Sequence, residues 1–295
     1  MRIFFTLCVL LFFTGILQGC TTTPAVTQNR VALVIENRDY PYERCKKSEK
    51  TKNKVCYSDL KSYSVDGPTE SLRKLGFTVL KLNDAIDEQI GVFKSLKDGT
   101  TEKIGAIQKF KDKLLSPDGG KLQPNTIGLV YFYGHGFEKE GNNYLVPTNY
   151  LQNDKPGISA NEWYERLSEG EAEGLLKGSA NIFILNVCRT LGQKEVEKNP
   201  SRLPARTLVA FATEPGQVAK STGPYTKTLL KYLSQPNLSI RDLFDKVNDE
   251  VRQLEANEAE NEKHRPTVIH GDDPEGLFRH TYFAGEGFEG AIDKW

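Results

Sequence analysis

The chain has 295 residues, and its 39 Lys and Arg residues balance 39 Asp and Glu residues, so the formal net charge is +0. This balance argues against a nucleic-acid-binding protein, which usually needs a basic surface to displace counterions from phosphates. The hydrophobic fraction of 38% is enough for a large core and excludes a disordered chain. The mean hydropathy of -0.49 excludes a polytopic membrane protein, and the length fits one globular domain.

The N-terminal segment reads as a secretory signal. Arg2 precedes an apolar run over residues 3–13, which is too short to cross a hydrocarbon core of about 30 Å. The ending Leu17-Gln18-Gly19-Cys20 resembles the lipobox of bacterial lipoproteins, and this resemblance implies cleavage before Cys20 and a lipid on its sulfur. We therefore expect a lipoprotein signal peptide over residues 1–19 and a lipidated tether over residues 20–29. A plain cleaved signal followed by a chance cysteine is the alternative.

The residue after Cys20 bears on the membrane to which the lipid would attach. It is Thr21, whereas an Asp at that position of a lipoprotein favours retention in the inner membrane. The resemblance thus implies an outer-membrane lipoprotein that faces the periplasm or the cell surface and contacts the membrane through its anchor.

The remaining cysteines divide into a pair and a single residue. Cys45 and Cys56 flank a Lys-rich segment and are close enough in sequence for a disulfide that closes this loop. Such a bond would contribute about 2 to 3 kcal/mol. Because Cys8 leaves with the signal and Cys20 carries the lipid, this pairing leaves Cys188 as a free thiol.

Strands and helices are predicted to alternate from residue 30 onward, without a second-domain boundary. Apolar β-branched runs that suit strands of a buried parallel sheet span residues 31–35, 78–82, 127–133, 182–187 and 208–211, and a last extended piece lies at 267–269. Helical spacing of apolar residues predicts amphipathic helices over 86–96, 104–114 and 240–254. Cap signals predict a helix between Asp66 and Gly76 and another that begins with Ser159 and Glu162. The pattern favours a doubly wound α/β fold with one domain over residues 30–295.

Two strand ends carry the candidate chemistry. In open α/β sheets, catalytic groups collect beyond the carboxyl ends of strands. Gly134-His135-Gly136 follows the third predicted strand, and Cys188 follows the fourth. A thiol and an imidazole at neighbouring strand ends suit a nucleophile and its proton acceptor, and the flanking glycines allow a sharp turn that offers the Gly136 N–H to an oxyanion. An imidazole partner predicts that Cys188 alkylates faster than a free thiol at pH 6.

From about Arg30 to Phe283, these motifs and their order resemble the bacterial caspase-like, or metacaspase-type, cysteine peptidases. The matching segments include Arg30 to Ile35, Val130 to Gly136, Asn143 to Pro147, Ile184 to Arg189 and Ala212 to Ala219. Cys188 follows His135 by 53 residues (188 minus 135), near the spacing of about 50 in caspases. The resemblance implies a three-layer sandwich around a mostly parallel six-stranded sheet. It also implies a His135–Cys188 dyad, an oxyanion site at the N–H groups of Gly136 and Cys188, and a polypeptide substrate. It requires no metal and no cofactor.

Departures from the family pattern bear on substrate preference. Members that cut after Arg or Lys usually carry an acid two residues before the cysteine, where this chain has Asn186, and often a Gly where it has Glu36. Asp66 matches a second acidic position of the family, so Asp66 and Asn186 are the candidate substrate-binding residues and a preference for Arg or Lys is expected. The basic residues of the loop over 190–206 have two interpretations: the protein cleaves itself in this loop, or the loop is only exposed and polar. A caspase-like module that binds a partner protein at the cell envelope without catalysis is the alternative function.

Overall fold

The computed structural model describes residues 29–40, 59–60, 67–90, 105–106, 126–139, 141–150, 157–168, 180–190, 202–220, 223–259, 263, 265–273 and 276–284. Several predicted features lie outside these residues. They are the signal, the tether up to residue 28, the Cys45–Cys56 pair, Asp66 and most of the two helices expected over 86–96 and 104–114. The predictions on these segments stay predictions.

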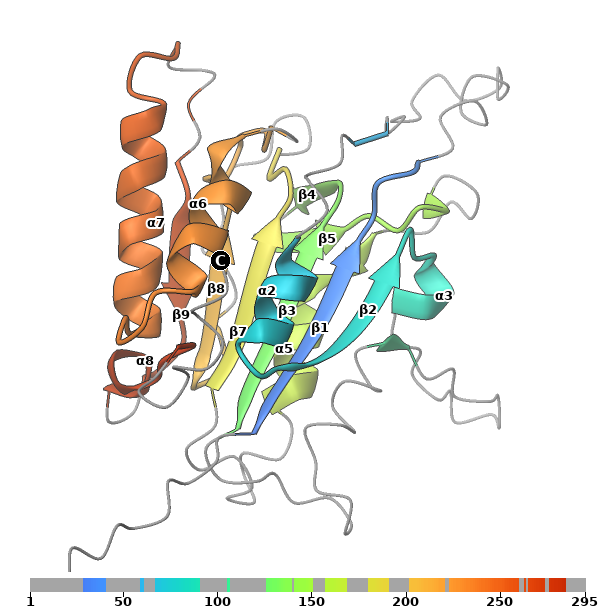
Figure 1. Cartoon of the computed structure of the whole chain (residues 1–295). Coiled ribbons are helices and arrows are strands. Elements are labelled where there is room, and N and C mark those ends of the chain that lie inside the picture. The colour runs from blue at the N-terminus through green and yellow to red at the C-terminus, as the bar shows by residue number, and fades with distance from the viewer. Residues whose placement is uncertain are drawn as a thin grey trace, which may run out of the picture.

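A six-stranded sheet forms the centre of the molecule (Figure 1). Its strands are β1 (Arg30–Glu36), β2 (Thr78–Asn83), β3 (Ile127–Tyr133), β7 (Ala180–Asn186), β8 (Thr207–Phe211) and β9 (Thr267–His270). They lie in the order β2-β1-β3-β7-β8-β9. All neighbours pair in parallel except β8 and β9. The predicted mostly parallel six-stranded sheet is therefore confirmed.

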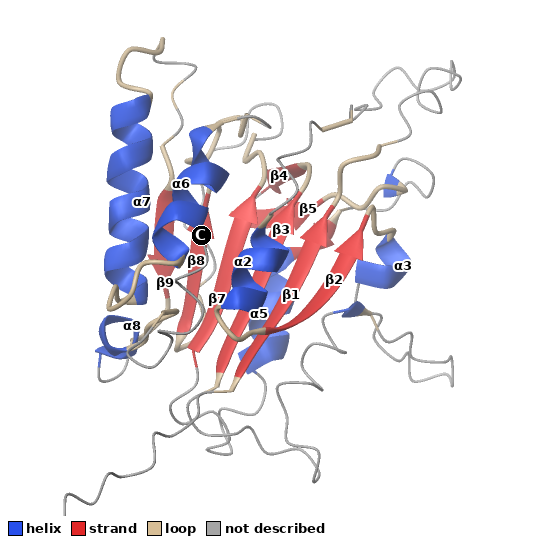
Figure 2. Cartoon of the chain, viewed as in Figure 1, coloured by secondary structure: helices blue, strands red, loops and turns tan. Residues whose placement is uncertain are grey.

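Helices cover both faces of this sheet (Figure 2). On one face, α2 (Pro68–Lys74), α6 (Pro224–Leu233) and α7 (Ile240–Leu254) bury apolar side chains such as Leu72, Leu229 and Leu243. On the other face, α5 (Ala160–Ser168) buries Trp163, and α3 (Asp87–Ile90) buries Ile90. Because both faces are covered, the residues of β1, β3 and β7 are buried throughout, which explains their continuous apolar sequences.

The described helix ends follow the sequence signals. The N-cap of α2 is Gly67. Pro68 occupies the first helical position, where a missing N–H costs no helix hydrogen bond. Gly76 adopts φ 78° directly after α2, as predicted for the residue that stops this helix. The side chain of Ser239 caps α7 by accepting a hydrogen bond from the Asp242 N–H at 3.1 Å.

A second, three-stranded sheet was not predicted. It contains β4 (Gly136–Lys139), β5 (Asn142–Leu145) and β6 (Ile158–Ser159), paired antiparallel. These strands have two to four residues, and β4 and β5 alternate between buried and more exposed positions, so they lack the long apolar runs that reveal the central strands. A short helix, α8 (Leu277–His280), closes the described chain near the buried side chain of Phe283.

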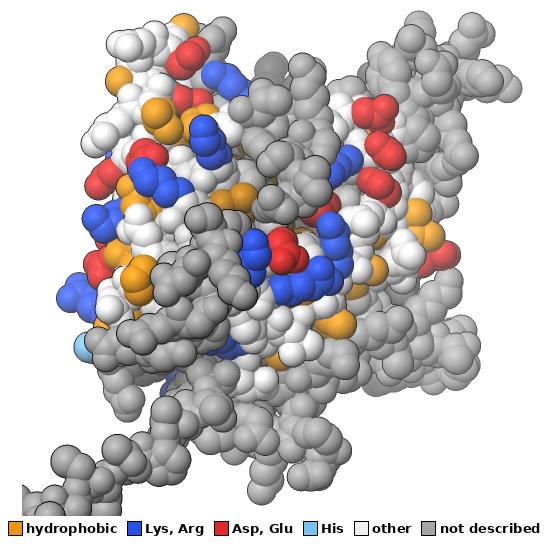
Figure 3. Space-filling model, in the orientation of Figure 1, with side chains coloured by type: hydrophobic (Ala, Val, Ile, Leu, Met, Phe, Trp, Pro, Cys, Tyr) orange, Lys and Arg blue, Asp and Glu red, His pale blue; other side chains and the backbone are white. Residues whose placement is uncertain are grey.

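On the face seen in Figure 3, acidic and basic side chains are interspersed over the described residues. Within the described ranges, we find no helix with the length and apolar character that a membrane span requires.

Candidate active site

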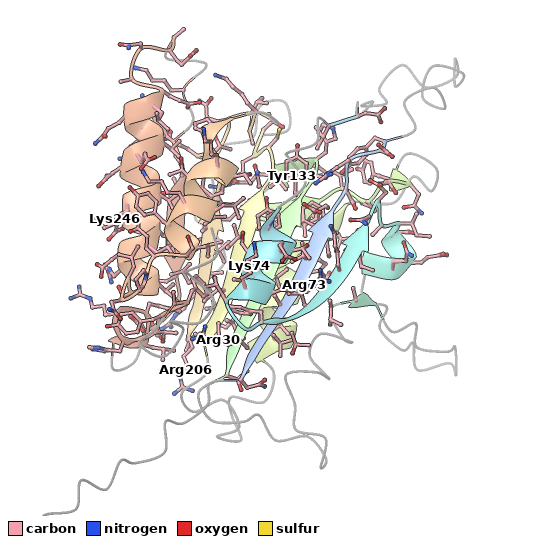
Figure 4. All side chains as sticks on the ribbon, in the orientation of Figure 1. Arg30, Arg73, Lys74, Tyr133, Arg206 and Lys246 are labelled. Atoms are coloured by element: carbon pink, nitrogen blue, oxygen red, sulfur yellow. The ribbon has the colours of Figure 1, made fainter. Side chains whose placement is uncertain are left out.

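Three central strands end level with one another at the carboxyl edge of the sheet. Glu36 of β1 is the register partner of Tyr133 of β3, and Tyr133 is the register partner of Asn186 of β7. Figure 4 labels Tyr133 at this edge, with Arg30 and Arg206 near the opposite edge. Side chains at paired positions point to the same face of a sheet. Residues that follow these three strand ends are therefore brought to one place by the fold.

His135 and Cys188 lie in the two segments that leave β3 and β7 side by side. The Gly134 N–H donates to the Asn186 carbonyl at 3.4 Å, and the Glu138 N–H donates to the Thr190 carbonyl at 3.2 Å. These two bonds bracket His135 on one segment and Cys188 on the other. Both side chains are partly exposed, so solvent reaches them.

Gly136 allows the close approach between these two segments. A Cβ at this position would lie 2.8 Å from the Cβ of Val187 and 3.0 Å from the Tyr144 carbonyl oxygen, closer than side-chain atoms normally approach. The glycine predicted to let the backbone turn sharply thus also lets it pack against the residue before Cys188.

The pairing of β4 with β5 sets the direction of the Gly136 N–H. The Val146 N–H donates to the His135 carbonyl at 3.0 Å, which makes the next antiparallel pair, Gly136 and Leu145, a non-hydrogen-bonded pair. The N–H groups of Gly136 and Glu138 therefore both point away from β5. Since the Glu138 N–H reaches the Thr190 carbonyl, the Gly136 N–H faces the side on which the Cys188 segment runs.

Tyr40 fixes the backbone and the ring of His135. Its hydroxyl accepts a hydrogen bond from the His135 N–H at 3.0 Å and donates one to the Val146 carbonyl at 3.0 Å. The two rings meet edge to face, with centroids 4.7 Å apart and planes at 68°. Tyr40 is only 4% exposed, so His135 packs against a side chain that is itself fixed in the core.

The thiol of Cys188 is free, and the residue is partly buried. It donates a weak hydrogen bond to the Ala219 carbonyl, with 3.7 Å between sulfur and oxygen. Burial raises the pKa of Cys188 above its ordinary value, and backbone hydrogen bonds at Ala219 and Cys188 act against this shift. Burial thus opposes the low thiol pKa that the prediction of fast alkylation at pH 6 requires.

Of the two candidate substrate-binding residues, only Asn186 is described. It is buried, and its Nδ2 donates to Thr226 Oγ1 at 2.7 Å. The carboxylate of Glu36 lies on the same face of the sheet, where Arg38 contacts it at 3.0 Å and Lys81 at 2.9 Å. The described part of this edge therefore combines one amide with one carboxylate that already holds two cations.

The described end of the basic loop over 190–206 is packed against Gly271 and Asp272, which directly follow β9. Arg202 pairs with Asp272 at 2.5 Å, and the Arg206 N–H donates to the Asp272 carbonyl at 2.8 Å. A Cβ at Gly271 would lie 1.9 Å from the Pro204 carbonyl oxygen, so only glycine allows this approach. Two of the four basic residues in the loop are therefore held in a packed segment.

A cavity of about 320 Å³ lies beside the segment that contacts Cys188. Its lining consists of Glu214, Arg252, Glu255, Ala256, Lys263 and Arg265. Arg265 approaches Glu214 at 3.9 Å, and Lys220 approaches Glu255 at 3.9 Å. Among the described residues, no group of three His, Cys, Asp or Glu side chains is arranged to hold a metal ion.

Sequence reasoning missed three residues that shape this edge. They are Tyr40, Glu138 and Arg189, each less than 5% exposed. Arg189 was visible as the residue after Cys188, but its contacts come from distant segments. Tyr40 and Glu138 carry no sequence signal of their own, because Tyr40 contacts His135 and Glu138 contacts Arg189, residues far away in the chain.

Comparison with known proteins agrees with this arrangement. The model of the peptidase C14 family, described as the caspase domain, matches residues 29–271. The mucosa-associated lymphoid tissue lymphoma translocation protein 1 of Homo sapiens is 29% identical over 173 residues, which cover 57% of this chain and 16% of that protein. The chain thus spans about a sixth of the length of this relative. Because the caspase-domain match extends over most of the sequence, the chain belongs to the caspase-domain family of peptidases.

Proposed function

We propose that this protein is a cysteine endopeptidase in which Cys188 is the nucleophile and His135 is the general base and acid. One observation carries the proposal. Two backbone hydrogen bonds, Gly134 to Asn186 and Glu138 to Thr190, hold the segments of His135 and Cys188 side by side at the carboxyl edge of the sheet. Family membership supports a polypeptide substrate at the same edge.

In the proposed reaction, the Cys188 sulfur attacks the carbonyl carbon of the scissile peptide while its proton passes to His135. The resulting oxyanion accepts hydrogen bonds from the N–H groups of Gly136 and Cys188. His135 then gives the proton to the leaving amine as the carbon–nitrogen bond breaks, which leaves a thioester. Water, deprotonated by His135, attacks the thioester and releases the acid and the thiol.

The raised pKa of Cys188 favours one version of this mechanism. Because burial raises the pKa of the thiol, it favours a neutral thiol over a thiolate paired with an imidazolium in the resting enzyme. His135 would then remove the proton during the attack, as a general base. Tyr40 supports this role, since it fixes both the main chain and the ring of His135.

The direct test compares the wild type with Cys188→Ala and His135→Ala on a mixed library of fluorogenic peptides. We expect turnover by the wild type and a loss of at least about a thousandfold in each variant. Circular dichroism must show that both variants are folded. A folded wild type that cleaves nothing in the library, and whose Cys188 reacts like an ordinary thiol, would instead favour the non-catalytic module that binds a partner protein.

We also propose a preference for Arg or Lys before the cleaved bond, with Glu36 supplying a carboxylate that Asn186 does not. Glu36 and Asn186 are the register partners of Tyr133 on its two neighbouring strands. Two strand spacings therefore separate their backbones by about 10 Å. The Glu36 Oε1 lies 3.4 Å from where a Cβ on Gly67 would be, and Gly67 directly follows Asp66. A substrate cation would replace Arg38 or Lys81 on this carboxylate.

Matched substitutions test this preference. Glu36→Gln is expected to lower kcat/KM for peptides with Arg before the cleaved bond about tenfold relative to peptides with Met, which is about 1.4 kcal/mol. Asn186→Asp is expected to change the same ratio in the opposite direction. Equal ratios in the wild type and both variants would remove Glu36 and Asn186 from substrate selection.

The N-terminal predictions lead to a further proposal, a protein anchored through lipid on Cys20 in the outer membrane. Cys20→Ser is expected to move the protein from the membrane fraction to the soluble fraction and to abolish labelling by a radioactive fatty acid. The Cys45–Cys56 disulfide has an independent test. Peptide mapping without reductant should recover both residues in one linked fragment, and finding two free thiols would refute the bond.

A further inference from the structure

Arg189, which directly follows Cys188, is a buried arginine that is 4% exposed. Its Nε donates to Glu138 Oε2 at 3.0 Å, and its Nη2 lies 2.7 Å from the same oxygen. Glu138 is 3% exposed, so the pair is withdrawn from water. Burying two charges carries a desolvation cost that two apolar side chains would avoid. Stability alone therefore explains this pair poorly.

The guanidinium is held in one orientation by groups from three other strands. Nε also donates to Asn143 Oδ1 at 3.2 Å, and Nη1 donates to Thr267 Oγ1 at 3.3 Å. The Cζ atom lies 4.0 Å from the centroid of the Phe211 ring. The planar guanidinium of an arginine has several N–H donors in a fixed arrangement and matches this set of partners, whereas the single ammonium of a lysine does not.

The main chain of Arg189 is fixed as firmly as its side chain. Its N–H donates to the Gln217 carbonyl at 2.9 Å, and its carbonyl accepts from the Gly216 N–H at 2.7 Å. The segment that makes these bonds continues to Ala219, whose carbonyl lies 3.7 Å from the Cys188 sulfur. The residue after the nucleophile is thus anchored on every side.

The partner of Arg189 lies on the segment that carries the second oxyanion donor. Glu138 follows Gly136 by two residues on β4, and its own N–H bonds to the Thr190 carbonyl at 3.2 Å. The ion pair and this hydrogen bond join the β4 segment to the Cys188 segment just after Gly136 and Cys188, and the bond from the Gly134 N–H to the Asn186 carbonyl joins the two segments before them.

We propose that Arg189 is a positioning residue that fixes the N–H groups of Gly136 and Cys188 relative to each other. The inference rests on the proposed function, since it concerns the oxyanion site of that reaction. Arg189 itself does not touch the substrate. It acts through Glu138, which holds the Gly136 strand, and through its own backbone, which holds Cys188.

Steady-state kinetics on enzyme titrated for active sites tests the proposal. Arg189→Met is expected to lower kcat about a hundredfold with KM changed less than about threefold, because a small misplacement of the donors weakens the transition state. Arg189→Lys should recover part of this loss. Arg202→Met, which removes an exposed arginine paired with Asp272, is the matched control and should keep the wild-type kcat.

A double variant separates positioning from folding. Arg189→Met leaves the Glu138 carboxylate buried without its partner, which lowers stability, and the added change Glu138→Gln removes that charge. We expect Arg189→Met/Glu138→Gln to regain most of the lost melting temperature but not the lost kcat. If kcat returns together with the melting temperature, Arg189 has only a structural role and the proposal is wrong.

Hydrogen exchange gives a result that needs no turnover. In Arg189→Met, the amides of Phe137, Glu138, Gly216 and Gln217 should exchange at least about tenfold faster than in Arg202→Met, while those of β1 and β3 keep their protection. Equal exchange in the two variants would overturn the inference. If the wild type shows no turnover but the two variants differ in exchange as expected, the peptidase proposal is wrong and the role of Arg189 in positioning the two segments is still supported.

Discussion

The two edges of the central sheet each bury an arginine, and they use it in different ways. At the amino edge, Arg30 donates to the backbone carbonyls of Leu75 at 2.9 Å, Tyr282 at 3.3 Å and Phe283, and its guanidinium lies over the Phe77 ring. At the carboxyl edge, Arg189 faces the carboxylate of Glu138 as well as side chains from three strands.

This difference suggests two roles: Arg30 is a structural clamp, which means that it holds distant segments of the fold together, and Arg189 positions active-site segments. Arg30 ties the start of β1 to the end of α2 and to the last described residues of the chain, which are segments that no candidate active-site residue occupies. Arg189 joins the segments that follow His135 and Cys188, and it also contacts Phe211 of β8 and Thr267 of β9. Substitutions at the amino edge should therefore reduce stability and spare catalysis, whereas substitutions at the carboxyl edge should reduce kcat beyond any effect on stability.

Gly136→Ala is expected to give the largest effect on catalysis. Its methyl group would lie 2.8 Å from the Val187 Cβ, so the two segments must move apart and the Gly136 N–H must leave its place. We expect kcat to fall about a hundredfold to a thousandfold, the range for losing one oxyanion donor.

Gly157→Ala is the control for crowding alone. A Cβ there would lie 3.0 Å from the Leu145 carbonyl oxygen, in the same small sheet but away from Val187. It should lower the melting temperature and leave kcat unchanged. A similar fall of kcat in both variants would mean that crowding of the small sheet, and not the oxyanion donor, limits the reaction.

Arg30→Met tests the clamp at the amino edge. It removes charged hydrogen bonds to three carbonyl oxygens, and we expect a loss of about 3 kcal/mol in the free energy of unfolding. Because the active site lies at the other edge, kcat per titrated site should stay at the wild-type value. Urea unfolding beside the exposed Arg73→Met measures the first effect, and a parallel fall of kcat would break the distinction between the edges.

The sequence predicted the parts of the fold that have a strong local signal. The central strands are buried on both faces and show it as continuous apolar runs, and α7 carries a regular apolar stripe from Ile240 to Val251. The small sheet was missed because β4 to β6 are short and depend on pairing with each other. For the same reason Glu138 and Tyr40 escaped notice, since their partners lie 51 and 95 residues away in the chain.

The candidate dyad was visible because His135 and Cys188 directly follow two strong strands. Their neighbourhood follows from the register of β3 with β7, in which Tyr133 pairs with Asn186. The electrostatic environment of the thiol was not visible in the same way. Burial raises the pKa of the thiol, and the hydrogen bond to the Ala219 carbonyl acts against this shift. Ala219 follows Gly216 and Gln217, which bond to the main chain of Arg189.

Tyr40→Phe is expected to give a smaller effect at the carboxyl edge. The ring that packs against His135 is kept, but the hydroxyl that joins the His135 N–H to the Val146 carbonyl is lost. We expect kcat to fall about tenfold, equivalent to about 1.4 kcal/mol, with little change in KM. Tyr232→Phe removes a hydroxyl from Glu250 on α7 and serves as the control. Equal kinetics for the two variants would show that Tyr40 does not position His135.

The pH dependence of Cys188 alkylation should show the smallest of these effects. It decides between the reactive thiol that the sequence predicts and the raised pKa that burial produces. The sequence predicts fast reaction at pH 6, whereas burial raises the pKa of the thiol above its ordinary value. Since only the thiolate reacts, a raised pKa makes the rate with iodoacetamide low at pH 6 and increasing beyond about pH 8.5, where a free thiol is half ionised. The rate is read by mass spectrometry from the peptide that contains Cys188, in the wild type and in His135→Ala. A wild-type rate that is already at its plateau at pH 6, and that His135→Ala removes, would show that an imidazolium outweighs burial and that the resting site is an ion pair.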